Sequence, residues 1–148
     1  MIPALYKAAQ AMYAADTTPT VGLVALLTGG YYTQEGPTTA AVPPYMIGSV
    51  QASAEMDSFG GDGSTGYFAF NIYTPKVSGA GAAISIGPTS DTIIARLRTV
   101  FHNQSTTVTF AGVTWRVSFK ASSGIAIPES DFAWHHAEVY QVTCFPST

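Results

Sequence analysis

The stretch PPYMIGSVQASAEMDSFGGDGSTGYFAFNIYT, residues 43–74, predicts two long strands joined by a glycine-rich connection. Between Tyr67 and Tyr73, large apolar residues alternate with smaller or more polar ones, which is the period of a half-buried strand. Pro43 and Pro44 mark the entry to the first strand, because neither can donate a ladder hydrogen bond. We therefore expect a long hairpin that buries one face, with Phe68, Phe70 and Ile72 in the core.

The connection between these strands is rich in glycine. Residues 58–66, SFGGDGSTG, place four glycines in nine positions, and they offer Phe59 as the one apolar anchor. Glycine adopts positive φ at little cost, so such a run forms a tip easily. A long hairpin with this kind of tip is typical of an assembly arm, and an ordinary surface hairpin is the alternative.

Apolar spacing predicts three helices elsewhere in the chain. Residues 3–15 and 88–101 carry apolar side chains at intervals of three and four, with Pro3 and Pro88 in the first turns. A shorter helix is expected at residues 19–27, where glycines follow at Gly29 and Gly30. Each helix has an apolar stripe, which indicates that it packs against a sheet.

The remaining strands are predicted from alternation. Residues 107–110 and 113–120 alternate clearly about a turn at residues 111–112, and residues 132–145 form a long strand whose two faces are both mixed. Residues 31–33 are a short extended piece, and residues 122–131 are expected to be a loop because they hold glycine and proline. The strongest stripes should oppose each other in the core: Ile94, Leu97 and Phe101 against Trp115, Val117 and Phe119.

This order of elements predicts an α+β fold with a single, mainly antiparallel β-sheet, a long hairpin and helices packed on one face. At 148 residues the chain is expected to form one domain, large enough to fold without disulfides or metal. Cys144 is the single cysteine, so no internal disulfide framework is possible, and we expect it to be buried.

The composition favours a subunit of an assembly. Charged residues make up 10% of the sequence and the net charge is −3. A surface so poor in charge does little to keep copies apart, although a small domain with a polar, uncharged coat is the alternative. The six Lys and Arg are scattered, which argues against specific nucleic-acid binding. The longest apolar run, residues 21–27, is too short to span a membrane.

No residue pattern predicts an enzyme. His135 and His136 are neighbours on a strand and point to opposite faces, so only His136 with Glu138 could share a metal ion, and two ligands are too few. Residues 60–65 resemble a phosphate loop but lack its lysine, and no nucleophile elbow occurs. We therefore expect no catalytic, cofactor or metal site.

Several motifs together resemble the tail-completion or tail-terminator proteins of long-tailed bacteriophages. These motifs are the amphipathic N-terminal helix, LLTGGYY at residues 26–32, VPPYMIG at residues 42–48, FNIYT at residues 70–74, and the helix at residues 91–101. The resemblance covers nearly the whole chain, which departs from the family pattern in its long Ala/Gly/Ser connector and its paired tyrosines, Tyr31 and Tyr32.

The resemblance implies a homo-hexameric ring that caps the tail tube and joins it to the head connector. The expected partners are further copies of the chain, the tail tube protein and the head–tail connector protein, in a virion assembled in the host cytoplasm. DNA would pass through the lumen without specific binding, and no membrane is involved. A head-side connector or stopper protein fits the same traits, and a monomeric β-rich ligand-binding module is a third hypothesis.

The hairpin and the terminal strand suggest where copies would meet, since sheets can pair through such elements. The residues expected at this interface combine tip carboxylates with aromatic and histidine side chains: Tyr45, Glu55, Asp57, Phe59, Asp62, Tyr67, His136 and Tyr140.

Overall fold

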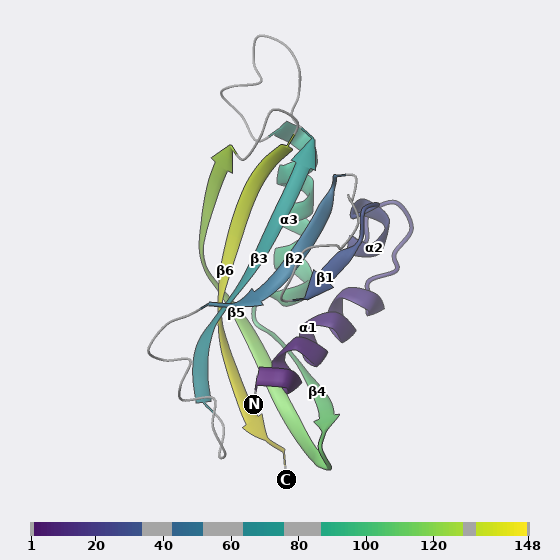
Figure 1. Cartoon of the computed structure of the whole chain (residues 1–148). Helices are drawn as coiled ribbons and strands as arrows, with labels where there is room; N and C mark the ends of the chain where they lie inside the picture. Colours follow the sequence, from purple (N-terminus) through teal and green to yellow (C-terminus); the bar gives the residue numbers. More distant parts are fainter. Residues whose placement is uncertain (1, 34–42, 52–63, 76–86, 129–132, 148) are drawn as a thin grey trace.

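A computed structural model describes residues 2–33, 43–51, 64–75, 87–128 and 133–147 (Figure 1). The helices are α1 (Ile2–Ala15), α2 (Leu23–Leu26) and α3 (Gly87–Phe101). The strands are β1 (Tyr31–Thr33), β2 (Tyr45–Val50), β3 (Ser64–Pro75), β4 (Gln104–Phe110), β5 (Val113–Pro128) and β6 (Ala133–Pro146).

One curled sheet holds all six strands, in the order β1-β2-β3-β6-β5-β4, and the three helices pack against it on one face. Every neighbouring pair is antiparallel except β1 and β2. The predicted hairpin is confirmed, with Tyr45 opposite Tyr73 and Val50 opposite Phe68. The predicted α+β class, with a single, mainly antiparallel sheet and helices on one side, is also confirmed.

Two local predictions are wrong. Residues 122–128, expected in a loop, continue β5 and pair with β6, where Gly124 lies opposite Glu138 and Pro128 opposite Trp134. The long neighbouring strand overrides the local composition, a register shift between Ala121 and Ser123 absorbs the irregularity, and proline is placed last, where a missing N–H matters least.

The second helix is also shorter than the predicted residues 19–27. It begins only at Leu23, because Thr20 has a φ of 64° and Gly22 is extended. Backbone atoms leave no room for a side chain at Gly22: a Cβ there would lie 2.5 Å from the carbonyl oxygen of Asp16. Glycine is therefore required at this position.

The core lies between the helices and the covered face of the sheet. Phe70 is at its centre, with its ring centroid 4.6 Å from that of Phe101, 4.9 Å from Phe68 and 5.4 Å from Tyr140. Of the residues expected in the core, Ile94 is half-buried and the others are buried: Phe68, Phe70, Ile72, Leu97, Phe101, Trp115, Val117 and Phe119. Cys144 is buried as expected.

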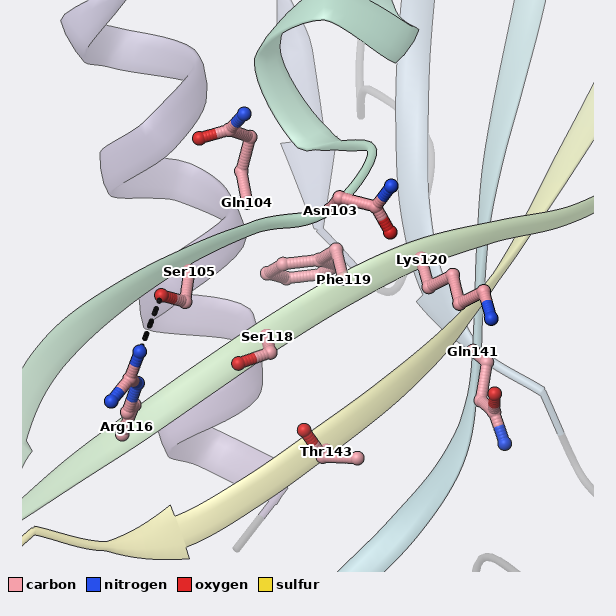
Figure 2. A pocket seen from close by; sticks show the side chains of 9 residues that line it. All are labelled: Asn103, Gln104, Ser105, Arg116, Ser118, Phe119, Lys120, Gln141 and Thr143. Carbon is pink, nitrogen blue, oxygen red and sulfur yellow. Dashed lines mark hydrogen bonds between the residues drawn. The ribbon is translucent and has the colours of Figure 1, made fainter.

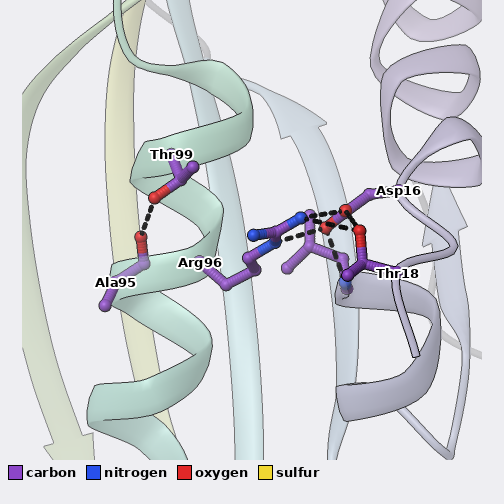
Figure 3. Close-up of polar contacts among 6 residues, drawn as sticks. Asp16, Thr18, Ala95, Arg96 and Thr99 are labelled. Carbon is purple, nitrogen blue, oxygen red and sulfur yellow. Dashed lines mark hydrogen bonds and ion pairs between the residues drawn. The ribbon is translucent and has the colours of Figure 1, made fainter. Parts of the chain in front are cut away.

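A buried carboxylate joins the first two helices to the third (Figure 3). Asp16 accepts a hydrogen bond of 2.7 Å from the backbone N–H of Leu23, and its carboxylate pairs with the guanidinium of Arg96 on α3. Arg96 Nε donates to Asp16 Oδ2 at 2.8 Å and Arg96 Nη2 donates to Asp16 Oδ1, so the ion pair is bidentate. Hydrogen bonding to Arg96 lowers the pKa of Asp16, against the effect of burial, and the Leu23 N–H adds to the lowering.

We expect Asp16→Asn to lower the free energy of unfolding at pH 7 by about 1–2 kcal/mol, because the amide retains the bond from Leu23 but loses the charge opposite Arg96. The folded-state pKa of Asp16 is depressed, so this stabilisation is present above the ordinary pKa of 3.8 and is lost as pH falls through the folded value. Urea unfolding of the wild type and of Asp16→Asn at pH 7 and pH 3 measures it: the difference between the two proteins should be smaller at pH 3 than at pH 7.

The matched control is Asp91→Asn, which neutralises an exposed carboxylate on α3. It should change the free energy of unfolding by less than about 0.5 kcal/mol, as is usual for an exposed charge. A constant difference between Asp16→Asn and the wild type from pH 7 to pH 3 would contradict the assigned role of the ion pair.

Candidate functional site

The sheet has one face that the helices leave uncovered, here called the open face (Figure 1). Successive side chains of a strand point to opposite faces, so the residues that alternate with the buried core belong to it. They are exposed or half-buried and mostly uncharged: Tyr45, Ile47 and Ser49 of β2, Tyr67, Asn71 and Tyr73 of β3, and His135, Ala137, Val139, Gln141 and Thr143 of β6. These residues make a neutral, partly aromatic surface on the side of the sheet away from the helices.

Four stacked or edge-on rings cross the open face from β1 to β6, here called the aromatic row. Tyr45 stacks on Tyr73 at 4.8 Å and 15°, and Tyr73 stacks on His135 at 4.6 Å and 10°. Tyr32 meets Tyr45 edge-on at 6.4 Å. The register accounts for the stack, because Tyr45 is directly opposite Tyr73 and Tyr73 is directly opposite His135.

Hydrogen bonds hold the end of this row. Asn71 Oδ1 lies 2.8 Å from His135 Nε2, and since an amide oxygen only accepts, the imidazole donates. The Asn71 amide nitrogen points the other way, 3.4 Å from both the Ile47 carbonyl oxygen and Ser49 Oγ. The row is thus fixed in position before any partner binds, which reduces the entropy cost of binding.

At the other end of the open face lies a polar hollow of about 370 Å³, here called the basic hollow (Figure 2). Arg116 and Lys120 of β5 flank it, and Arg116 donates to Ser105 Oγ at 3.5 Å. Lys120 lies opposite Gln141, and Ser118 lies opposite Thr143. The nine lining residues include no carboxylate: Asn103, Gln104, Ser105, Arg116, Ser118, Phe119, Lys120, Gln141 and Thr143.

Three residues of the described strands carry a formal charge, and they divide between the two faces of the sheet: Glu138 on the covered face, Arg116 and Lys120 on the open face. On the covered face, Glu138 is 1% exposed, and Arg98 Nη2 lies 3.1 and 3.4 Å from its two oxygens. His136 Nε2 is 3.1 Å from the same carboxylate. In the part of the chain that the structure describes, Arg116 and Lys120 have no carboxylate partner, so the open face is positive there although the whole chain is acidic.

Two residues expected at an interface are in the core instead. His136 is 8% exposed and Tyr140 is fully buried, because pairing with β3 places both on the covered face of β6, with Ile72 and Phe68 as their partners. Burial raises the pKa of Tyr140. The prediction that these two side chains form a surface is therefore corrected.

The other interface candidates divide into two groups. Tyr45 and Tyr67 lie half-buried on the open face, and Tyr45 belongs to the aromatic row. The tip residues Glu55, Asp57, Phe59 and Asp62 lie outside the described residues.

Sequence reasoning missed the aromatic row and the basic hollow. The alternation of Trp115, Val117 and Phe119 does place Arg116 and Lys120 on the opposite face, so that signal was present. The sequence pattern does not give the pairing register of the strands, which places Lys120 opposite Gln141 and Tyr73 opposite His135.

The arrangement gives no basis for metal chemistry in the described part of the chain. His136 and Glu138 do meet, as their spacing allowed, but the third group there is Arg98, whose charge repels a cation. No cluster of three or more potential metal ligands occurs among the described residues. No described helix is long and apolar enough to cross a membrane.

Comparisons of the sequence with protein-family models and with curated proteins find no match. The fold, however, is similar to that of a chain in the virion of a native gene transfer agent (GTA) particle. That likeness has a TM-score of 0.64 at 15% identity and covers 97% of this chain and 96% of that chain. A second solved chain has a TM-score of 0.57 at 17% identity, over 96% of this chain and 91% of the other. This chain therefore shares the fold of a gene transfer agent virion protein along nearly its whole length.

Proposed function

We propose that this chain is a structural protein of a phage-like virion and acts as a tail-terminator or tail-completion subunit. In this role it forms a hexameric ring that caps the tail tube and joins it to the head connector. The observation that carries the proposal is the likeness in fold to a gene transfer agent virion chain, which extends over almost all of both chains. The sequence motifs that resemble the tail-terminator family add the finer role.

The surface is compatible with permanent contacts between copies. The open face presents the aromatic row and few charges, and tyrosine is enriched in the centres of protein interfaces. The short strand β1 and the outer strand β4 end the sheet, so neighbouring sheets can meet at two different edges. Contacts between unlike surfaces generate a closed ring when the rotation between copies closes.

The proposed partners are further copies of the chain, the tail tube protein and the head–tail connector protein, in a particle assembled in the host cytoplasm. DNA would pass through the lumen without specific binding, which suits an acidic chain of net charge −3. The role requires no chemistry of catalysis and no cofactor.

Native mass spectrometry of the purified chain, with negative-stain imaging, tests the ring. We expect a discrete hexamer, and a monomer at all concentrations would refute the proposal in favour of a small ligand-binding module. The finer role is tested by depleting the chain during particle assembly. Tails of uncontrolled length would support the terminator role, whereas tails of normal length detached from heads would assign the chain to the head-side connector instead.

A further inference from the structure

The outer strand β4 has none of the features that usually protect the edge of a sheet. Its sequence, QSTTVTF, contains no charged residue and no proline, and it pairs with β5 without a register shift from Gln104 to Phe110. Edge strands of native proteins are typically very short, charged, bulged or covered, because an unpaired ladder recruits another strand. The edge of β4 is therefore suited to pairing with a further strand.

The turn after β4 determines which backbone groups point outward. Ala111 and Gly112 both have positive φ, 50° and 78°, as a two-residue type I′ hairpin requires. Such a turn makes Phe110 and Val113 a hydrogen-bonded pair, and these pairs recur at every second residue of an antiparallel ladder. The N–H and C=O groups of the odd-numbered residues of β4 therefore point away from β5.

Two side chains cap this edge near its ends. Lys7 of α1 donates a hydrogen bond of 2.7 Å to the carbonyl oxygen of Thr109, which agrees with the outward direction inferred from the turn. At the other end, His102 Nδ1 accepts a hydrogen bond of 3.0 Å from the N–H of Ala121, on the part of β5 that extends beyond β4. The caps limit the open part of the edge to the middle of β4.

This middle part, residues 105–107, is here called the edge site. The outward N–H and C=O groups of Ser105 and Thr107 have no hydrogen-bond partner in the described part of the chain, and both residues are exposed. Arg116 of β5 leans across β4 toward this site: its backbone is opposite Thr107, and its Nη2 lies 3.5 Å from Ser105 Oγ (Figure 2). Lys120 is on the same face of β5, just beyond the last pair with β4. Unpaired backbone groups and two cations therefore lie side by side.

We propose that the edge site binds an extended, acidic segment of a partner protein, which pairs with β4 as a further strand. Strand addition takes its affinity from main-chain hydrogen bonds and its specificity from alternate side chains. A residue directly opposite Ser105 projects onto the open face, with its Cβ about 5 Å from that of Ser105. A glutamate there reaches the Arg116 guanidinium, and a second acid two residues along the segment comes level with Lys120.

The charge beside the edge site selects this class of partner. The residues that line the basic hollow include no carboxylate, and hydroxyl and amide groups surround Arg116 and Lys120. Complementary charges speed docking and reject wrong partners. A basic strand would be repelled, whereas a phosphate alone would pair with the cations but leave the outward backbone groups of β4 unpaired. The two features together fit an acidic peptide better than either alternative.

The inference goes beyond the proposed function. It concerns a partner other than the neighbouring copy, and it holds whether or not the chain forms a ring. Its failure is therefore distinguishable from failure of the ring, which native mass spectrometry tests separately.

Two synthetic seven-residue peptides with blocked ends test the site on the full chain. Both consist of threonine and valine except at the third and fifth positions, which hold glutamate in the acidic peptide and glutamine in the amide peptide. Amide hydrogen exchange is read residue by residue by NMR. Saturating acidic peptide should slow exchange at Ser105 and Thr107 at least about tenfold, because their N–H groups become bonded. The amide peptide should bind about fivefold more weakly, as expected for the loss of an exposed ion pair.

Two variants separate the backbone from the charge. Thr107→Pro removes one outward N–H and keeps the ladder to β5, so neither peptide should protect Ser105. Arg116→Gln keeps the edge, so both peptides should still protect Ser105 and should bind with nearly equal affinity. Thr106→Pro is the matched control for the direction of the edge, because its N–H points toward β5. It should lower the urea midpoint well below that of Thr107→Pro, and circular dichroism verifies that the variants are folded.

Other results overturn the inference. Exchange at Ser105 and Thr107 that stays fast in millimolar acidic peptide would mean that β4 accepts no strand, and equal affinity of the wild type for the two peptides would remove charge from the recognition. Slow exchange at both residues before peptide is added, reversed by dilution, would assign the edge to a second copy. Inorganic phosphate that shifts the Arg116 resonances as strongly as the acidic peptide does, at the same concentration, would assign the hollow to a phosphate.

Discussion

Phe70→Ala should lower the free energy of unfolding by about 3–5 kcal/mol, a large fraction of the roughly 5–15 kcal/mol that is typical of folded domains. Phe70 is fully buried, and its ring lies within aromatic contact distance of rings from four other elements. Those neighbours are Tyr31 of β1, Phe101 of α3, Phe119 of β5 and Tyr140 of β6. Removing the ring loses its burial and leaves a cavity that so many rigid neighbours cannot fill.

Urea unfolding followed by circular dichroism measures this loss. Phe145→Ala is the matched control, because that ring is 47% exposed near the end of β6. It should cost less than about 1 kcal/mol, in the range of surface substitutions. Equal losses for the two variants would mean that Phe70 is not at the centre of the core.

The sequence alone predicts most of the fold, because alternation and helical spacing report which side chains are buried. Phe68, Phe70 and Ile72 alternate without interruption, so the covered face of β3 could be read directly. The long strand β6 could not be read in this way. His136, Glu138 and Tyr140 are polar or amphipathic, and their burial follows from their tertiary partners: Ile72 opposite His136, Arg98 paired with Glu138, and Phe68 opposite Tyr140.

The candidate site is less accessible to sequence reasoning, because it depends on register. The basic hollow combines residues 103–105 with side chains of β5 and β6, which come together only when β4, β5 and β6 pair in one particular alignment. The continuation of β5 through residues 122–128 likewise depends on pairing with β6. Local composition indicates a loop there, and a long neighbouring strand overrides that preference.

Trp115→Ala should also cost about 3–5 kcal/mol and unfold much of the population near physiological temperature. Trp115 is 4% exposed on β5, between Val108 of β4 and Pro146 of β6, at the end of the sheet against which α1 packs. Helices α1 and α3 pack against β5, and the strands on either side of Trp115 are fixed by their ladders, so the lost volume is not readily filled. Truncation there removes the largest side chain of that region.

The conservative change Trp115→Phe separates packing from polarity. Trp115 Nε1 is buried and has no hydrogen-bond partner among the described residues, so the indole carries an unpaired donor that phenylalanine lacks. Losing this donor offsets part of the lost burial, because a buried unpaired polar group costs about 1–3 kcal/mol. We therefore expect Trp115→Phe to change the free energy of unfolding by less than about 1.5 kcal/mol, far less than alanine. Unfolding curves of the two variants provide the comparison.

Indole fluorescence in a Trp134→Phe background verifies the burial, since the chain has two tryptophans and Trp115 then emits alone. Emission typical of a water-exposed indole, or equal losses for alanine and phenylalanine, would contradict a tightly packed Trp115.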